Sequence, residues 1–125
     1  MKREDIREIT MQLVYQMDIT NDFKVDDLSI VEENVRAAGK KQAAETLSAV
    51  QDHHDHIDEV ISSNLDKWTI ERIARTDLAI LRTAVAEMLY VDSIPVSVSI
   101  NEAVNLAKKY GDERSYAFIN SVLGK

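Results

Sequence analysis

DLAILRTAVAEMLYV, residues 77–91, is the stretch that decides the fold. Its apolar side chains recur every three or four residues, which predicts a helix. They cover a wide arc of that helix: Leu78, Ile80, Leu81, Ala84, Val85, Met88 and Leu89. A helix that is apolar over most of its circumference is buried on several sides. We therefore expect it to be the central, most buried element, with Thr76 as its N-cap.

Three helices are predicted before the central one. The first spans about residues 2–18, with an apolar stripe made of Ile6, Ile9, Leu13 and Met17. A second is expected between Ser29 and Gly39, because Ser29 and Glu32 have capping-box spacing and glycine commonly ends a helix. A third is expected over about residues 41–65, where apolar residues again form one seam. Thr69 is expected to cap a further short helix.

The part of the chain after the central helix begins with its single proline, Pro95. Residues 96–98 are expected to form an extended linker. Ser99 and Glu102 again have capping-box spacing, which predicts a helix that ends at Gly111. Asp112 is expected to cap a last helix, to about residue 123.

The chain is therefore predicted to be all-α, with about seven helices packed as one or two bundles. Its 125 residues fit one domain, and 45% of them are apolar, which excludes a disordered protein. There is no cysteine, which excludes disulfides and thiolate chemistry. No apolar run approaches the ~20 residues of a membrane span. A cytoplasmic protein is the simplest interpretation.

The net charge of −7 argues against a general nucleic-acid binder. Residues 18–66 hold four basic and twelve acidic side chains, a net charge of −8, and the remainder holds eleven and ten, a net charge of +1. The net negative charge is therefore concentrated in residues 18–66. Both ends of the chain are freer to meet an anionic partner.

The first helix carries candidate binding residues. Tyr15 and Met11 are predicted to lie nearly opposite the apolar stripe, which indicates either a protein-binding surface or a face that another helix covers. Lys2, Arg3 and Arg7 form a small basic cluster. This cluster either binds phosphates or is an ordinary solvated helix end.

The last helix carries a second candidate. Phe118 is expected about 100° from the inward stripe, with Arg114 one turn before it. An aromatic ring beside an arginine is a plausible stacking platform for an unpaired base. The alternative is that Phe118 packs beneath a neighbouring helix. Lys108 and Lys109 favour the C-terminal end of the preceding helix, and they also add positive charge near Arg114.

Enzymatic and metal-binding functions have little support. His53 and His56 have a spacing seen in helical metal sites, but no further ligand is marked. The sequence has no glycine-rich phosphate loop, nucleophile elbow or paired-carboxylate motif. We expect no catalysis, no metal and no cofactor.

Three segments together resemble the NusB transcription antitermination family. They are WTIERIARTDLAILRTAVAEMLY (68–90), IPVSVSINEAVNLAKKYGDERS (94–115) and FINSVLGK (118–125). REITMQLVYQMD, residues 7–18, resembles the end of the family's first helix. The resemblance spans nearly the whole chain and is weakest between residues 23 and 65. It implies two small helical bundles, here about residues 1–66 and 67–125, without catalysis or a cofactor.

The resemblance also implies partners. Members of this family bind boxA RNA, notably in ribosomal RNA leader transcripts, as a heterodimer with the small-subunit ribosomal protein NusE. The complex joins other Nus factors on RNA polymerase and suppresses premature termination. Some relatives form homodimers by covering the same surface. A protein-only helical scaffold without direct RNA binding is the alternative function.

The resemblance assigns functions to individual positions. It implies RNA contacts for Lys2, Arg3, Arg7, Tyr15, Arg114, Ser115 and Phe118. It implies NusE contacts for Tyr15, Glu71, Arg72, Asp77 and Arg82. Many relatives have an arginine-rich N-terminus, which Glu4 and Asp5 interrupt here. We therefore hypothesise that this acidic chain binds RNA poorly alone and that a basic partner completes a composite site.

Overall fold

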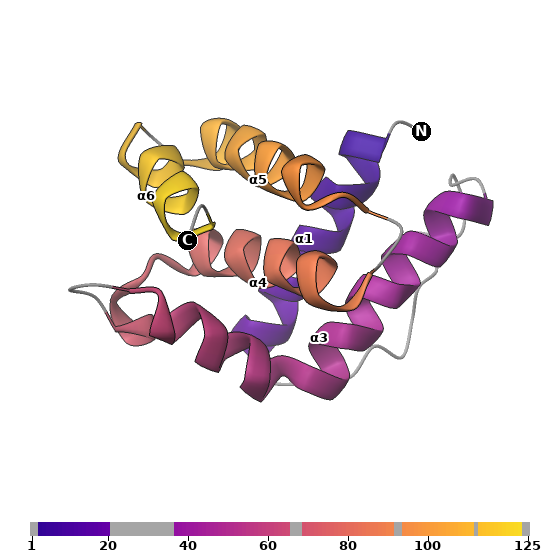
Figure 1. The fold of residues 1–125 in the computed structure, drawn as a ribbon, viewed down its shortest axis with the longest axis horizontal. Helices are drawn as coiled ribbons and strands as arrows, with labels where there is room; N and C mark the ends of the chain where they lie inside the picture. Colours follow the sequence, from indigo (N-terminus) through magenta and orange to yellow (C-terminus); the bar gives the residue numbers. More distant parts are fainter. Residues whose placement is uncertain (1–2, 21–36, 66–68, 92–93, 112, 124–125) are drawn as a thin grey trace.

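The computed structural model describes residues 3–20, 37–65, 69–91, 94–111 and 113–123 (Figure 1). These residues form helices and no strand. The α-helices are α1 (Arg3–Thr20), α3 (Ala37–Ser63), α4 (Arg75–Tyr90), α5 (Val96–Tyr110) and α6 (Glu113–Leu123), and a short 3-10 helix, η1, spans Ile70–Arg72. The all-α prediction is confirmed. About seven helices were predicted for the chain, and the described residues contain five α-helices and η1, so the count differs.

Helix α4 lies at the centre of the molecule, as the sequence predicted. Helices α1, α3, α5 and α6 all pack against it (Figure 1). Every residue from Asp77 to Glu87 is buried. The predicted cap is wrong by two residues: Ala74 is the N-cap, and its carbonyl oxygen accepts a 2.9 Å hydrogen bond from the Leu78 amide. Thr76 therefore lies inside the helix.

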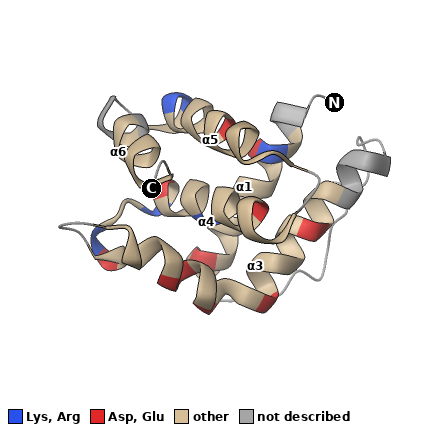
Figure 2. Cartoon of the chain, in the orientation of Figure 1, with Lys and Arg blue, Asp and Glu red and all other residues tan. Residues whose placement is uncertain are grey.

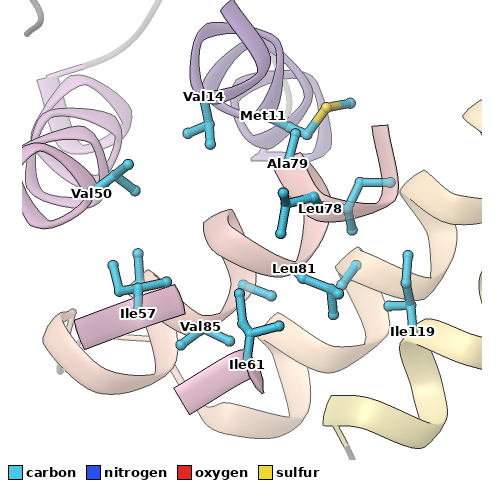
Figure 3. Close-up of a cluster of buried hydrophobic side chains, with 14 of the residues drawn as sticks. Met11, Val14, Val50, Ile57, Ile61, Leu78, Ala79, Leu81, Val85 and Ile119 are labelled. Carbon is cyan, nitrogen blue, oxygen red and sulfur yellow. The ribbon is translucent and has the colours of Figure 1, made fainter. Parts of the chain in front are cut away.

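The main core lies where α1, α3, α4 and α6 meet around the apolar side chains of α4 (Figure 3). Among its buried members are Met11, Val14, Val50, Ile57, Ile61, Leu81, Val85 and Ile119. The prediction that Met11 faces outward is wrong, whereas Ile9 and Leu13 are only half-buried. The reason is that α1 packs against α3 and α4 at once, so its buried arc is broader than one stripe.

Helix α3 bends within its length (Figure 1). His53 has non-helical backbone angles, φ −128° and ψ 21°, between two helical segments. The predicted stop at Gly39 is wrong, because α3 begins at Ala37 and continues through that glycine. The remainder of the predicted helix between Ser29 and Gly39 lies outside the described residues.

Helix α5 begins one turn earlier than predicted. Pro95 is its N-cap, and the Pro95 carbonyl accepts hydrogen bonds from the amides of Val98 and Ser99 at 3.0 and 3.2 Å. The expected extended linker over residues 96–98 is therefore the first turn of the helix, a position compatible with a preceding proline. Ser99 is buried inside α5 and does not cap it. The predicted end at Gly111 is confirmed.

Gly111 allows α6 to approach α5 closely. A Cβ atom at this position would overlap the Cβ of Ser115 and would lie 3.0 Å from the Ala107 carbonyl oxygen. The Ser115 Cβ is fixed to its backbone, so rotation of the side chain does not relieve this overlap. The absence of a side chain at Gly111 therefore sets the distance between the two helices.

Gly111→Ala is expected to lower the free energy of unfolding by about 1–3 kcal/mol, the usual cost of overfilling a packed site. Urea denaturation followed by circular dichroism measures this change. Gly39→Ala is the control, because alanine is the better helix former and the backbone of α3 is helical there. An unchanged stability in Gly111→Ala would show that the contact with Ser115 relaxes without cost.

Candidate functional site

The exposed face of α1 lies beside the C-terminal end of α5. Glu8, Gln12 and Tyr15 follow one another at intervals of one helical turn on this face. The Nζ of Lys109 lies 2.8 Å from Oε1 of Glu8. The Tyr110 hydroxyl donates a hydrogen bond to Glu8 and accepts one from Nε2 of Gln12 at 3.0 Å. We call these five residues the α1–α5 surface.

The charges on the α1–α5 surface are balanced by direct contacts. Hydrogen bonds from Lys109 and Tyr110 lower the pKa of the Glu8 carboxyl below its ordinary value. The same contact with Glu8 raises the pKa of the Tyr110 hydroxyl. Glu8 is therefore ionised at neutral pH and fixes the end of α5 against α1. The Lys109 side chain remains mostly exposed and accessible to an anion.

Two residues of this surface offer aromatic area to solvent. Tyr15 is 37% exposed and Tyr110 is 39% exposed. The sequence analysis singled out Tyr15 but missed Tyr110. An aromatic residue directly after two lysines was the available signal.

Helix α6 packs against α5 and against the central helix α4. Phe118 is half-buried and packs against the main core, so one part of its ring remains accessible. Ser115 is also half-buried and lies one turn earlier on α6. The side chains of Lys2, Arg3 and Arg114 lie outside the described residues. Both alternatives for Phe118, packing and exposure, therefore apply in part.

Arg7 does not offer its guanidinium to solvent. It is 4% exposed, and its Nε donates a 2.9 Å hydrogen bond to Oε1 of Glu87 on α4. Burial raises the pKa of Glu87 above its ordinary value of 4.5, and the charge of Arg7 opposes that shift. The prediction that Arg7 grips a phosphate is contradicted by this placement, because its charge is already used between α1 and α4.

Arg82 also points inward, at the opposite end of α1. Its Nε and Nη2 each donate a 2.8 Å hydrogen bond to Asp58 on α3, and Nη1 lies 3.3 Å from Oδ1 of Asp18 on α1. Arg75 adds a 2.9 Å hydrogen bond to Asp18. Burial alone would lower the pKa of Arg82, but the contacts with Asp58 and Asp18 outweigh it and raise that pKa. This ion cluster joins three helices.

The residues expected to meet a protein partner therefore divide into two groups. Glu71 and Arg72 are exposed on η1 and are accessible. Asp77 and Arg82 are buried, so they are not available to a partner as placed here. Arg82 instead holds α1, α3 and α4 together, next to the segment that carries Glu71 and Arg72.

The charge distribution follows the sequence. Acidic residues lie mainly along α3, while basic residues lie at the C-terminal end of α5 and around η1 (Figure 2). Two histidines of α3 pack against the Tyr90 ring: His53 stacks on it with ring centroids 4.3 Å apart, and His56 meets it edge-on at 6.5 Å.

Among the described residues, no group of three or more potential ligands is arranged to hold a metal ion. No helix in this part of the chain has the length and apolar character needed to cross a membrane.

Comparison with protein families gives a match over nearly the whole chain. The model of the NusB family matches residues 4–125. A protein of Geobacillus kaustophilus named transcription antitermination protein NusB is 43% identical, over 100% of this chain and 95% of that protein. A protein of the same name from Finegoldia magna is 40% identical, over 99% and 92% respectively.

Solved structures give the same fold. The structure of T. maritima NusB has a TM-score of 0.86 and 30% identity, and the match covers 99% of this chain and 89% of that one. A NusB chain in a crystal structure of NusB and NusE in complex with dsRNA has a TM-score of 0.83 and 23% identity, over 98% and 92%. The second likeness concerns the fold alone.

Proposed function

This chain belongs to the NusB family, and on that premise we propose that it is a transcription antitermination factor that binds boxA-type RNA together with NusE. The observation that carries the proposal is the α1–α5 surface, which offers two aromatic rings and a lysine on one side of the fold. RNA-binding proteins recognise unpaired bases by stacking on aromatic rings and by contacts to phosphates.

The proposed RNA path runs along three helices. Tyr15 on α1 and Tyr110 on α5 provide stacking area, and Lys109 provides a cation between them. Phe118 and Ser115 extend the path along α6, which packs on α5. Lys2, Arg3 and Arg114 are proposed to add phosphate contacts.

The proposed NusE surface is the outer side of η1 and the neighbouring end of α1. Glu71 and Arg72 are its accessible charged residues. Tyr15 lies on the same helix as Asp18, which the ion cluster ties to α4, so α1 connects the RNA and partner surfaces. The net charge of −7 favours a basic partner over direct binding of free RNA.

RNA affinity is expected to rise when NusE is added. A fluorescence titration of boxA-type RNA, with and without NusE, measures the two affinities at one salt concentration. The composite site predicts clearly tighter binding with NusE. Equal affinities would reject it, and a flat RNA titration with tight NusE binding would favour the protein-only scaffold.

Tyr15→Ala is expected to weaken RNA binding to the complex by about 1–3 kcal/mol, the value of one stacked base. Its stability is expected to change little, because the ring is 37% exposed. Val96→Ala is the matched control, since Val96 is a more exposed apolar residue that belongs to neither proposed surface. A fall in thermal stability with normal binding would mean that Tyr15 is a packing residue.

The remaining features of the proposal follow from the family. The role is non-catalytic and cytoplasmic, and other Nus factors and RNA polymerase are the further partners. The chain is proposed to divide into two small helical bundles, about residues 1–66 and 67–125. A homodimer that covers the RNA and partner surfaces is proposed as a storage form, which the net charge of −7 disfavours at low salt.

A further inference from the structure

A small apolar groove lies between the second half of α3, the end of α4 and the end of α6. Its volume is about 80 Å³, and its lining includes Val60, Asn64, Met88, Leu89 and Val122. Leu89 is 45% exposed, although it belongs to the central helix. None of the lining residues belongs to the α1–α5 surface or to η1. The groove is therefore separate from the surfaces proposed for RNA and NusE.

Aromatic rings continue the groove along the same edge of the molecule. His56, Val60 and Asn64 succeed one another at four-residue spacing and share one face of α3. The ring of His56 meets the Tyr90 ring edge-on, and Tyr90 follows Leu89 on α4. The groove and these rings form one strip of apolar and aromatic surface between α3 and α4.

Acidic side chains border this strip. Asp52 and Glu59 are exposed on α3, where Asp52 lies one turn before His56 and Glu59 precedes the groove residue Val60. Residues 51–63 contain no lysine or arginine, and Figure 2 shows the acidic residues spread along this helix. An acidic border repels nucleic acid. It also disfavours a second copy of this chain, whose net charge is −7.

We propose that this acidic-bordered groove binds a basic amphipathic helix of a protein partner. Apolar side chains at intervals of three and four residues fit a groove between helices, as in other helix-in-groove complexes. Lysines and arginines on the flanks of such a helix would reach Asp52 and Glu59. Opposite charges of this kind set the orientation of the bound helix and exclude acidic competitors.

The test uses the full chain and a labelled peptide made of leucine and lysine. The leucines follow helical spacing over about five turns, and a second peptide has the same composition in scrambled order. Fluorescence anisotropy measures binding of both peptides to the unaltered chain, to Leu89→Asp, and to Asp52→Asn combined with Glu59→Gln. Ile19→Asp is the control, because Ile19 is an exposed apolar residue on α1, outside the groove.

Leu89→Asp is expected to weaken binding of the amphipathic peptide at least about tenfold, or ~1.4 kcal/mol. The double variant is expected to weaken binding and to reduce its dependence on salt. Ile19→Asp is expected to bind normally. RNA and NusE binding by Leu89→Asp should be unchanged. A failure of the peptide prediction would therefore leave the proposed function intact.

Three results would overturn the proposal. The first is equal binding of the scrambled and amphipathic peptides, which would indicate charge attraction without a groove. The second is normal peptide binding by Leu89→Asp. The third is sedimentation evidence that the chain self-associates and that Leu89→Asp abolishes this, which would make a second copy the occupant.

Discussion

Arg82→Ala is expected to lower the free energy of unfolding by about 3–5 kcal/mol, the usual cost of breaking a buried ion pair from one side. Arg82 is 5% exposed and contacts Asp18 and Asp58 on two other helices. Its removal leaves the Asp58 carboxylate without the counter-charge of Arg82 and leaves Asp18 with only the exposed Arg75. Urea denaturation at neutral pH measures the loss.

Arg75→Ala is the matched control for this prediction. Arg75 contacts the same Asp18 at 2.9 Å, but its side chain is 60% exposed. Exposed ion pairs contribute about 0–1 kcal/mol, so the control is expected to lose little stability. Similar losses in both variants would show that burial does not set the strength of this cluster. A small loss in Arg82→Ala would mean that water replaces the guanidinium.

The sequence sufficed to predict the helical class and the central position of α4. Eleven consecutive buried residues, from Asp77 to Glu87, match the wide apolar arc of that segment. Ile119, Val122 and Leu123 on α6 are buried, as the apolar spacing indicated. Long apolar periodicity is a strong local signal, and it needs no knowledge of the neighbouring helices.

Helix boundaries were harder to predict, because several residues compete for the same cap. Thr76 and Ser99 both have good capping chemistry, yet α4 begins after Ala74 and α5 after Pro95. Helix α4 begins two residues and α5 four residues before the predicted starts, and the added residues Arg75 and Val96 are exposed. A side-chain cap contributes only about 1 kcal/mol, which is too little to fix a helix start against the rest of the fold.

The candidate site was predicted in part. Tyr15 is exposed, as an off-stripe aromatic residue should be, but Met11 faces the core. Arg7 was expected at a surface because it belongs to a basic cluster, and Arg82 because the family resemblance implied a NusE contact. Their partners are Glu87, 80 residues from Arg7, and Asp58, 24 residues from Arg82. Local periodicity carries no information about such distant pairs, so burial of these charges became visible only in the fold.

The two buried arginines act on the same helix. The Arg7–Glu87 pair and the Arg82–Asp18 contact both join α1 to α4, one near each end of α1. Between them lies the exposed face with Gln12 and Tyr15. The internal ion pairs therefore position the α1–α5 surface, even though they do not belong to it. A variant of either arginine is expected to change binding only through the placement of α1.

Arg7→Met is expected to lower the free energy of unfolding by about 3–5 kcal/mol at neutral pH, because Glu87 is left buried without its counter-charge. Lys109→Met is the control, because the Lys109 side chain that pairs with Glu8 is 62% exposed and exposed ion pairs contribute little to stability. Arg7→Met combined with Glu87→Leu is expected to recover most of the loss. Chemical denaturation of the single and double variants gives the coupling energy.

The pH dependence of Arg7→Met distinguishes a lost ion pair from lost packing. Burial raises the pKa of Glu87 in the folded chain above its ordinary value of 4.5, so the folded state binds more protons than the unfolded state above that pH. The contribution of Glu87 to the free energy of unfolding therefore falls as pH rises from 4.5 through the raised pKa. Arg7 opposes the rise in pKa, so in Arg7→Met the pKa of Glu87 is higher and the fall continues to higher pH. The deficit relative to the unaltered chain should be smallest in acid and grow toward neutral pH. A deficit that is constant with pH would mean that Arg7 stabilises α1 by packing alone.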